Sequence, residues 1–173
     1  NIKYSFKTSL VGKIQIKNIL MSILAANKIG LPMQKIIGSI NRLKPVTGRL
    51  QEIGKLKNNA KVILDYAHTP DALFNCITSV KDQFKLSKIS IVFGCGGERD
   101  KSKRKIMGEI ANKYCEFIYL TDDNPRREDP KKIRSDVKKK LKRSKFLEIS
   151  SREKAISLAV KNLNSGDILI VAG

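Results

Sequence analysis

The chain has 173 residues, 41% of them hydrophobic, and a formal net charge of +19 at neutral pH. This apolar content is sufficient for a packed core and excludes a wholly disordered chain, and no run of about 18 uncharged apolar residues is available to span a membrane. The three cysteines form neither a CxxC pair nor a Cys/His cluster, so no zinc site or disulfide framework is indicated and a reduced, cytoplasmic compartment is expected.

The first third of the chain is typical of the helical tail of a domain. Apolar residues at helical spacing predict a helix over residues 16–30. They are Ile16, Ile19, Leu20, Ile23 and Leu24. Gly30 ends this helix, a second helix is expected over residues 32–43, and a loop follows over residues 44–53. We expect a domain boundary after residue 58, in a short polar stretch.

From residue 59 onward, apolar runs alternate with helical patterns. The expected strands are short apolar runs at residues 61–67, 88–94, 116–121, 145–150 and 167–173. The expected helices lie between them, at residues 69–84, 100–115, 129–142 and 151–164. Strands that are apolar throughout and separated by helices predict a parallel sheet covered on both faces. The fold class is therefore α/β, with a Rossmann-like, doubly wound domain over residues 59–173.

The high positive charge has two interpretations. Lysines are spread along the whole chain, and the densest run, residues 137–145, falls on a predicted surface helix and its exit loop. The four tyrosines and six phenylalanines are not interleaved with this run, as they would be in a platform for single-stranded nucleic acid. We therefore favour a solvated surface. A basic, non-catalytic module that binds nucleic acid is the alternative, and a steep loss of affinity with salt would support it.

Unusual polar residues gather where the predicted strands end. Asp65, Tyr66 and His68 follow the first of these strands, and GCGGERDKSKR follows the second. TDDNPRRED follows the third, and Gly173 stands at the end of the last. Ligands of parallel sheets bind beyond the carboxyl ends of the strands. The sequence therefore predicts a binding site at this edge.

The GCGGERD segment is a candidate anion site. Gly94, Gly96 and Gly97 permit a left-handed backbone and uncovered amides, which predicts an anion nest just before a helix. Arg99 could hold a carboxylate with two hydrogen bonds. A dinucleotide fingerprint, and with it a nicotinamide-dependent oxidoreductase, is the alternative, but Arg99 stands where the third glycine of that motif belongs.

Two single residues have open interpretations. His68 is the only histidine and lies between a strand end and a helix start, so a structural and a functional role are both open. No Ser/His/Asp arrangement indicates nucleophilic catalysis. Arg49 follows a glycine in the loop between the expected domains, where it is either an exposed side chain or a phosphate or ribose contact.

The motifs KPVTGRLQEI, DYAHTPDAL, VFGCGGERDKSKR, TDDNPRREDP and LIVAG resemble the Mur ligases in order and spacing, over residues 12–173. The resemblance is strongest to the members that add meso-diaminopimelate to UDP-N-acetylmuramoyl-L-alanyl-D-glutamate in peptidoglycan synthesis. It implies that residues 1–58 end the central ATP-binding domain and that residues 59–173 form most of the C-terminal, amino-acid-binding domain. The implied reaction is an amide ligation driven by ATP and assisted by Mg²⁺, through an acyl phosphate of the D-glutamate.

The resemblance also implies part of a nucleotide site. It places Asn18 and Arg49 near the nucleotide and Asp65 at its ribose. It also places His68 close to the nucleotide, and His68 is the one candidate here for a catalytic role.

The implied diaminopimelate site centres on the DNPR motif. Its residues here are Asp123, Asn124, Pro125 and Arg126, joined by Arg99 and Gly173. The far end of diaminopimelate is a zwitterion, so Arg126 can bind its carboxylate while Asp123 and Asn124 face its ammonium. Pro125 fixes the turn. A lysine substrate would leave Arg126 unpaired in a partly buried pocket, at a cost of roughly 3–5 kcal/mol.

The chain departs from the family pattern in three respects. It begins at Asn1, without the P-loop, the carbamylated lysine or the UDP-sugar domain, and it stops before the family's KGHE segment. We therefore expect a fragment that binds diaminopimelate weakly and does not catalyse alone, with no metal ligand of its own. The family's GD is replaced by Gly97-Glu98, which leaves Arg99 in place. We expect a monomer.

Overall fold

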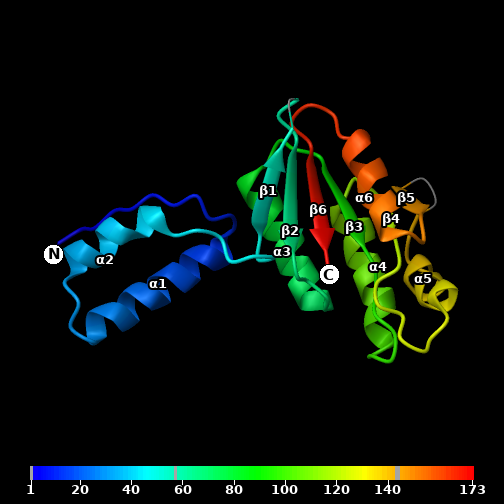
Figure 1. Cartoon of the computed structure of the whole chain (residues 1–173), viewed down its shortest axis with the longest axis horizontal. Helices are drawn as coiled ribbons and strands as arrows, with labels where there is room; N and C mark the ends of the chain where they lie inside the picture. Colours follow the sequence, from blue (N-terminus) through cyan, green and yellow to red (C-terminus); the bar gives the residue numbers. More distant parts are fainter. Residues whose placement is uncertain (1, 57, 143–144) are drawn as a thin grey trace.

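The computed structural model describes residues 2–56, 58–142 and 145–173, which form an α/β body with two helices beside it (Figure 1). The body contains a six-stranded sheet in the order β1-β2-β6-β3-β4-β5. The strands are β1 (Gln51–Lys55), β2 (Lys61–Asp65), β3 (Ile89–Phe93), β4 (Phe117–Leu120), β5 (Phe146–Glu148) and β6 (Ile168–Ala172). All neighbouring pairs from β2 to β5 are parallel, which confirms the predicted α/β class.

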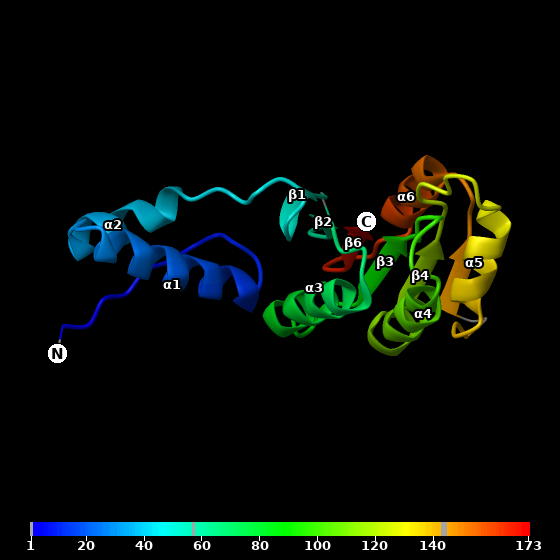
Figure 2. The same ribbon diagram turned by 90° about the horizontal axis from the view of Figure 1, so that it is seen from below.

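Helices cover both faces of the sheet. The helices α3 (Pro70–Gln83), α4 (Ser102–Tyr114) and α5 (Pro130–Lys138) lie on one face, and α6 (Arg152–Lys161) lies on the other (Figure 2). Successive strand residues point to opposite faces, so Ile91 packs in the cluster under the first three helices, whereas Val92 packs in the cluster under α6. Both side chains are fully buried. This is why the strands are apolar throughout.

The helix starts follow the local sequence. The Thr69 side chain caps α3 by accepting a hydrogen bond from the Ala72 amide at 3.3 Å, and Pro70 occupies the first turn. The Ser151 side chain caps α6 in the same way, accepting from the Lys154 amide at 3.3 Å. These caps fix where each crossover leaves the edge of the sheet.

The strand β1 was not predicted. Residues 44–53 were expected to be a loop, but Gln51–Lys55 pairs antiparallel with β2. The segment has one large apolar residue, Ile53, and its pairing shifts register between Glu52 and Gly54, so it carries no alternating pattern. Tertiary pairing with β2 makes it a strand. The sheet thus begins before the boundary expected after residue 58, and that boundary stays a prediction.

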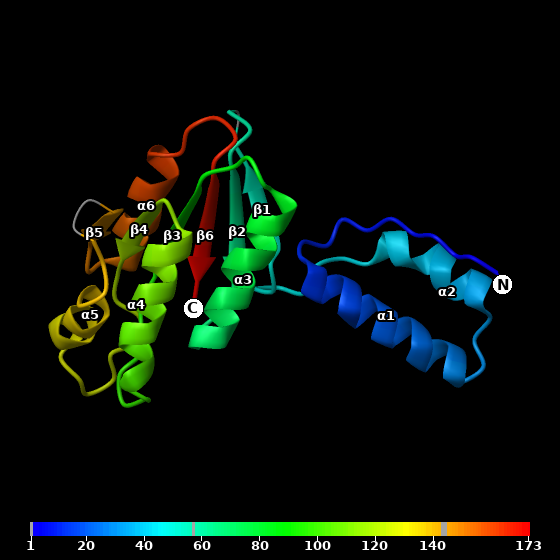
Figure 3. The ribbon, with the colours of Figure 1, turned by 180° about the vertical axis from the view of Figure 1, so that it is seen from behind.

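The remaining helices extend away from the sheet on the side of β1 and α3 (Figure 3). They are α1 (Lys13–Lys28), α2 (Met33–Ser39) and the short 3-10 helix η1 (Ile40–Arg42). Their cluster buries Ile19, Ile23, Ile36 and Ile40. Leu20 and Leu24, expected on the same apolar face of α1, are 47% and 62% exposed. Among the described residues, no helix combines the length and the apolar character needed to cross a bilayer.

The start of α1 is attached to the sheet body through α3. The Gly12 amide donates to the side-chain oxygen of Gln83 at 2.8 Å, and the Lys13 ammonium lies 2.7 Å from the Asp82 carboxylate. A Cβ on Gly12 would come within 2.7 Å of Leu50, and the glycine has a φ of +93°. Only glycine therefore fits comfortably at this attachment.

Candidate functional site

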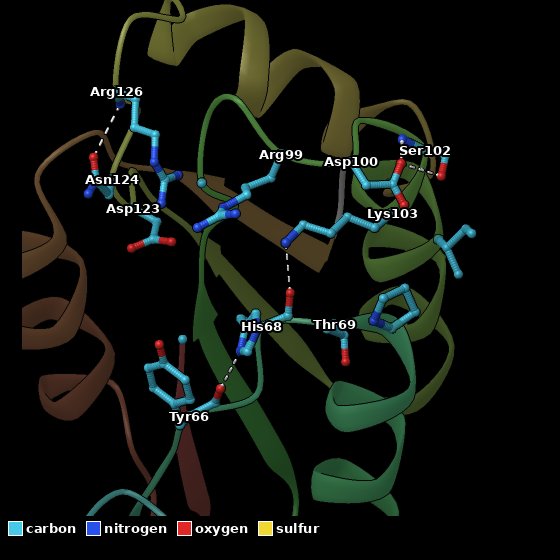
Figure 4. Close-up of a pocket in the computed structure, with 14 residues that line it drawn as sticks. Tyr66, His68, Thr69, Arg99, Asp100, Ser102, Lys103, Asp123, Asn124 and Arg126 are labelled. Carbon is cyan, nitrogen blue, oxygen red and sulfur yellow. Dashed lines mark hydrogen bonds between the residues drawn. The ribbon is translucent and has the colours of Figure 1, made fainter.

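The carboxyl ends of β2, β3, β4 and β6 meet at one edge of the sheet, where a pocket of about 790 Å³ lies (Figure 4). We call residues 94–101, after β3, the glycine loop and residues 121–129, after β4, the DNPR loop. Most of the residues predicted for the diaminopimelate site line this pocket. They are Arg99, Asp123, Asn124, Arg126 and Gly173. Pro125 does not line it.

The pocket carries side chains of both charges. Arg99, Lys103 and Arg126 bring positive charge from the two sides, and Asp100 and Asp123 bring negative charge (Figure 4). Lys103, which the sequence analysis did not single out, donates to the His68 carbonyl at 2.9 Å. This mixture suits a ligand that carries both signs of charge.

Asp100 organises the end of the glycine loop. Its carboxylate accepts from the Ser102 hydroxyl at 2.6 Å and from the Ser102 amide at 2.9 Å. These two bonds hold the pKa of Asp100 below its usual value. The carboxylate therefore remains charged beside Lys103 and helps to fix the start of α4.

The glycine loop is not an anion nest, so that prediction was wrong. None of Gly94, Gly96 and Gly97 has a positive φ. The Gly97 amide already donates to the Asn124 carbonyl at 2.9 Å, and the Glu98 amide donates to the Glu128 carboxylate at 2.5 Å. These two amides are therefore unavailable to a ligand.

The glycines instead allow the two loops to lie against each other. A Cβ on Gly97 would overlap the carbonyl of Pro125, and a Cβ on Gly94 would come within 2.5 Å of the Thr121 carbonyl. Close approach of two backbones, rather than left-handed geometry, requires glycine at these positions.

The DNPR loop turns sharply at Arg126, which has a φ of 50°. The Asn124 side-chain oxygen accepts a hydrogen bond from the Arg126 amide at 3.2 Å, and the Pro125 carbonyl accepts one from the Glu128 amide at 3.0 Å. Asparagine is suited to such a turn because its side chain mimics a backbone carbonyl. The turn directs the Arg126 side chain toward the pocket (Figure 4). Arg126 is nevertheless exposed. The sequence analysis assumed a partly buried side chain, so it overestimated the free-energy cost of leaving Arg126 unpaired.

A buried arginine lies behind the two loops. Arg104, on α4, is 0% exposed and bonds the Glu128 carboxylate at 2.9 and 3.0 Å. The hydrogen bond that Arg104 donates to Glu128 raises the pKa of Arg104, and the same bond lowers the pKa of Glu128. Sequence reasoning missed this pair because only the fold brings the two residues together.

Gly173 is held at the pocket by its neighbours. Its amide donates to the Asp65 carbonyl at 3.0 Å, and its φ is +88°. Arg152, at the start of α6, donates to the carbonyls of Ala172 and Gly173 at 2.9 and 2.8 Å. Burial lowers the pKa of Arg152, and the charge of Asp123 opposes this shift.

A second pocket, of about 430 Å³, lies between α1 and the sheet body. It brings together three residues that the resemblance assigned to the nucleotide, Asn18, Arg49 and Asp65. The Asp65 carboxylate accepts from the Leu50 amide at 2.8 Å. Burial raises the pKa of Asp65, while the bonds from the Leu50 and Ala67 amides and the charge of Arg49 oppose this rise.

His68, the fourth of those residues, lines the first pocket and not the second. Its Nδ1 lies 3.1 Å from the Tyr66 carbonyl, and its ring stands edge-on to the Tyr66 ring at 5.0 Å. The Arg49 guanidinium, which lines the second pocket, also lies over the Tyr66 ring, 5.4 Å from the ring centre. Tyr66 therefore links the two pockets.

Residues 48–173 match a family described as "Mur ligase, glutamate ligase domain". A Rickettsia conorii protein named UDP-N-acetylmuramoyl-L-alanyl-D-glutamate--2,6-diaminopimelate ligase is 44% identical over 100% of this chain and 36% of its own length. A solved structure of a ligase of the same name is 33% identical, with a TM-score of 0.72 over 98% of this chain and 35% of that one. Mycobacterium tuberculosis folylpolyglutamate synthase complexed with ADP shares the fold, with a TM-score of 0.78 at 15% identity over 97% of this chain and 39% of that one. The chain thus spans about a third of the length of the curated relatives it matches.

Proposed function

This chain belongs to the Mur ligase family, and on that premise we propose that it is the acceptor-binding part of an ATP-dependent ligase. The ligase adds meso-diaminopimelate to UDP-N-acetylmuramoyl-L-alanyl-D-glutamate during peptidoglycan synthesis in the cytoplasm. The first pocket holds the far end of diaminopimelate. The second pocket holds part of the nucleotide.

The mixed charge of the first pocket is the observation that supports this proposal. Arg126 and Arg99 face the same space as Asp123 and Asn124 (Figure 4). The far end of meso-diaminopimelate carries one carboxylate and one ammonium, so both of its groups find partners here. Lysine has only the ammonium, and it would leave the two arginines with no anion to bind. Because these arginines are exposed, the resulting preference amounts to about 1.5–3 kcal/mol, the usual range for hydrogen bonds to charged groups.

The second pocket supports a nucleotide contact. Asn18 and Arg49 offer an amide and a guanidinium, and Asp65 offers a carboxylate for the ribose hydroxyls. Tyr66 and Arg49 join this pocket to the first, so the nucleotide and the amino acid would lie on either side of one aromatic ring. This chain would therefore orient both partners toward a common reaction centre.

The described residues contain no large cluster of metal-binding side chains. Across residues 2–56, 58–142 and 145–173, no group of three or more His, Cys, Asp or Glu side chains is arranged to hold a metal ion. The role proposed for the residues of this chain is to bind and orient the amino acid and part of the nucleotide.

The test is an assay of the protein that includes the upstream and downstream segments its relatives contain. Phosphate release is measured with ATP, Mg²⁺, the UDP-linked dipeptide and either meso-diaminopimelate or L-lysine. We expect turnover with diaminopimelate and a kcat/KM for lysine lower by about tenfold or more, the equivalent of about 1.4 kcal/mol. Equal kcat/KM values for the two amino acids would overturn the assignment of the pocket.

A further inference from the structure

We propose that Arg104 and Glu128 are positioning residues of the first pocket. Their ion pair, in which Arg104 is buried and Glu128 is half-buried, holds the glycine loop against the DNPR loop and so sets the directions of Arg99 and Arg126. The proposal rests on the proposed function, because that function assigns the two exposed arginines to the substrate. Arg104 and Glu128 do not line the pocket themselves.

Arg104 joins three separate segments. Its guanidinium bonds Glu128 of the DNPR loop, the Gly96 carbonyl of the glycine loop at 3.4 Å, and Asp136 of α5 at 3.3 Å. Its Nε is buried and has no hydrogen-bond partner among the described residues. A buried charge with incomplete partners is poor evidence for stability, since apolar residues of similar volume often pack as well. Its three partners indicate a role in fixing loop geometry.

Glu128 holds the glycine loop next to Arg99. Its carboxylate accepts a hydrogen bond from the Glu98 amide at 2.5 Å. Glu98 has a φ of 51°, a left-handed conformation that is unusual for a residue with a side chain. Arg99 follows directly in the chain. The bond to Glu128 therefore stabilises the backbone turn from which Arg99 enters the pocket.

The same contacts orient Arg126. Its Nη1 donates to the Gly97 carbonyl at 2.6 Å, so one side of its guanidinium is held by the glycine loop. The Gly97 amide in turn donates to the Asn124 carbonyl at 2.9 Å. If the glycine loop moves, Arg126 loses the partner that fixes its guanidinium. The Arg104–Glu128 pair is the link that keeps the two loops together from behind.

The chain provides a control in a second glutamate–arginine pair, one that does not hold the glycine loop. Glu148, on β5, accepts from Nε of Arg134 at 2.7 Å and from the Lys138 ammonium at 2.5 Å. Arg134 is 8% exposed at its side chain, so this is also a glutamate paired with a nearly buried arginine. Glu148 lies on neither of the two loops and does not line the pocket, but Arg134 also pairs with Asp122 of the DNPR loop. Glu148→Gln keeps an acceptor oxygen for Arg134 and so leaves the Arg134–Asp122 pair in place.

The experiment compares Glu128→Gln with Glu148→Gln in the full ligase described under the proposed function. We expect Glu128→Gln to raise the KM for meso-diaminopimelate about tenfold or more while the KM for ATP changes less than about twofold, because a tenfold change corresponds to the loss of one charge-assisted contact. Glu148→Gln should lower the melting temperature without changing either KM. Arg104→Lys keeps the charge but loses the forked geometry of the guanidinium, so it should also raise the KM for the amino acid. If Glu128→Gln does not fold, Arg104→Lys is the variant that tests the proposal.

Two results would overturn the positioning role. One is an unchanged KM for the amino acid in folded Glu128→Gln or Arg104→Lys. The other is an equal rise in Glu148→Gln, which would show that the effect does not depend on the link between Glu128 and the glycine loop. Failure of the proposed function is a separate outcome. In that case wild-type protein does not turn over meso-diaminopimelate, and the same comparison is made on the KM for the amino acid that it does use.

Discussion

Arg126 donates through Nη1 to the carbonyl oxygen of Gly97 at 2.6 Å, so the side chain with the most direct proposed role in binding also joins the two loops of the pocket. The arginine contributes to the shape of the pocket as well as to its charge. Substitutions of Arg126 or Gly97 should therefore weaken binding of the amino acid more than binding of the nucleotide.

Arg126→Ala should raise the KM for meso-diaminopimelate by about 10- to 100-fold, equivalent to about 1.5–3 kcal/mol for hydrogen bonds to a charged group. Binding of ATP, measured by protection against thermal unfolding, should be unchanged. Arg127→Ala is the control, because Arg127 is an exposed neighbour that does not line the pocket. Normal turnover of Arg126→Ala at low diaminopimelate concentration would contradict the assignment.

Gly97→Ala should lower the free energy of unfolding by about 1–3 kcal/mol, the usual cost of overpacking, because its Cβ would overlap the Pro125 carbonyl. Urea unfolding measures this change. Gly38→Ala is the matched control, since nothing lies within 4 Å of its Cβ and Gly38 stands in α2. That substitution should be neutral or stabilise the protein by up to about 1 kcal/mol through helix propensity. If both variants unfold alike, the close contact of the two loops is not required.

Acid should destabilise the wild-type protein partly through Glu128. The hydrogen bond from Arg104 lowers the pKa of Glu128 in the folded state, so the stabilisation is present above the pKa of an unfolded glutamate, about 4.3, and is lost as the pH falls through the lower folded value. Glu128→Gln removes this titration. The melting temperature of the variant should therefore fall less than that of the wild type between pH 6 and pH 3. Parallel melting curves for the two proteins would show that Glu128 does not contribute.

Asp65→Asn and His68→Ala should separate the two pockets. Asp65 lines the second pocket, so its substitution should raise the KM for ATP by about 5- to 10-fold, in the range of one hydrogen bond. His68 lines the first pocket, so its substitution should change the KM for the amino acid instead. Both constants are measured for each variant. A rise in the KM for ATP with His68→Ala would instead support the nucleotide role that the resemblance implied.

Most of the elements could be predicted from the sequence because each one carries a local signal. Thr69 and Pro70 determine the start of α3, and the apolar runs of β3 and β6 are buried on both faces, a pattern that a parallel sheet produces. The strand β1 lacks such a signal, because its pairing with β2 depends on a register shift between Glu52 and Gly54.

The charged residues of the first pocket were predicted more completely than the residues that hold them. Asp123 and Arg126 follow a strand end and are recognisable from the motif. Arg104 and Glu128 lie far apart in sequence, and their pairing depends on how α4 packs beside the DNPR loop. The glycines illustrate the same limit: the sequence shows that small residues are needed after β3, but only the Pro125 carbonyl beside Gly97 shows why.

The two outer strands of the sheet have a consequence for self-association. An exposed edge strand can pair with the edge of another molecule and begin aggregation. Here β1 is interrupted by its register shift, and β5 extends only over Phe146–Glu148. Neither edge offers a long, regular row of free backbone groups to a second copy of the chain. We therefore expect the sheet to stay confined to one molecule even at the high concentrations used in crystallisation or NMR, which sedimentation velocity can check.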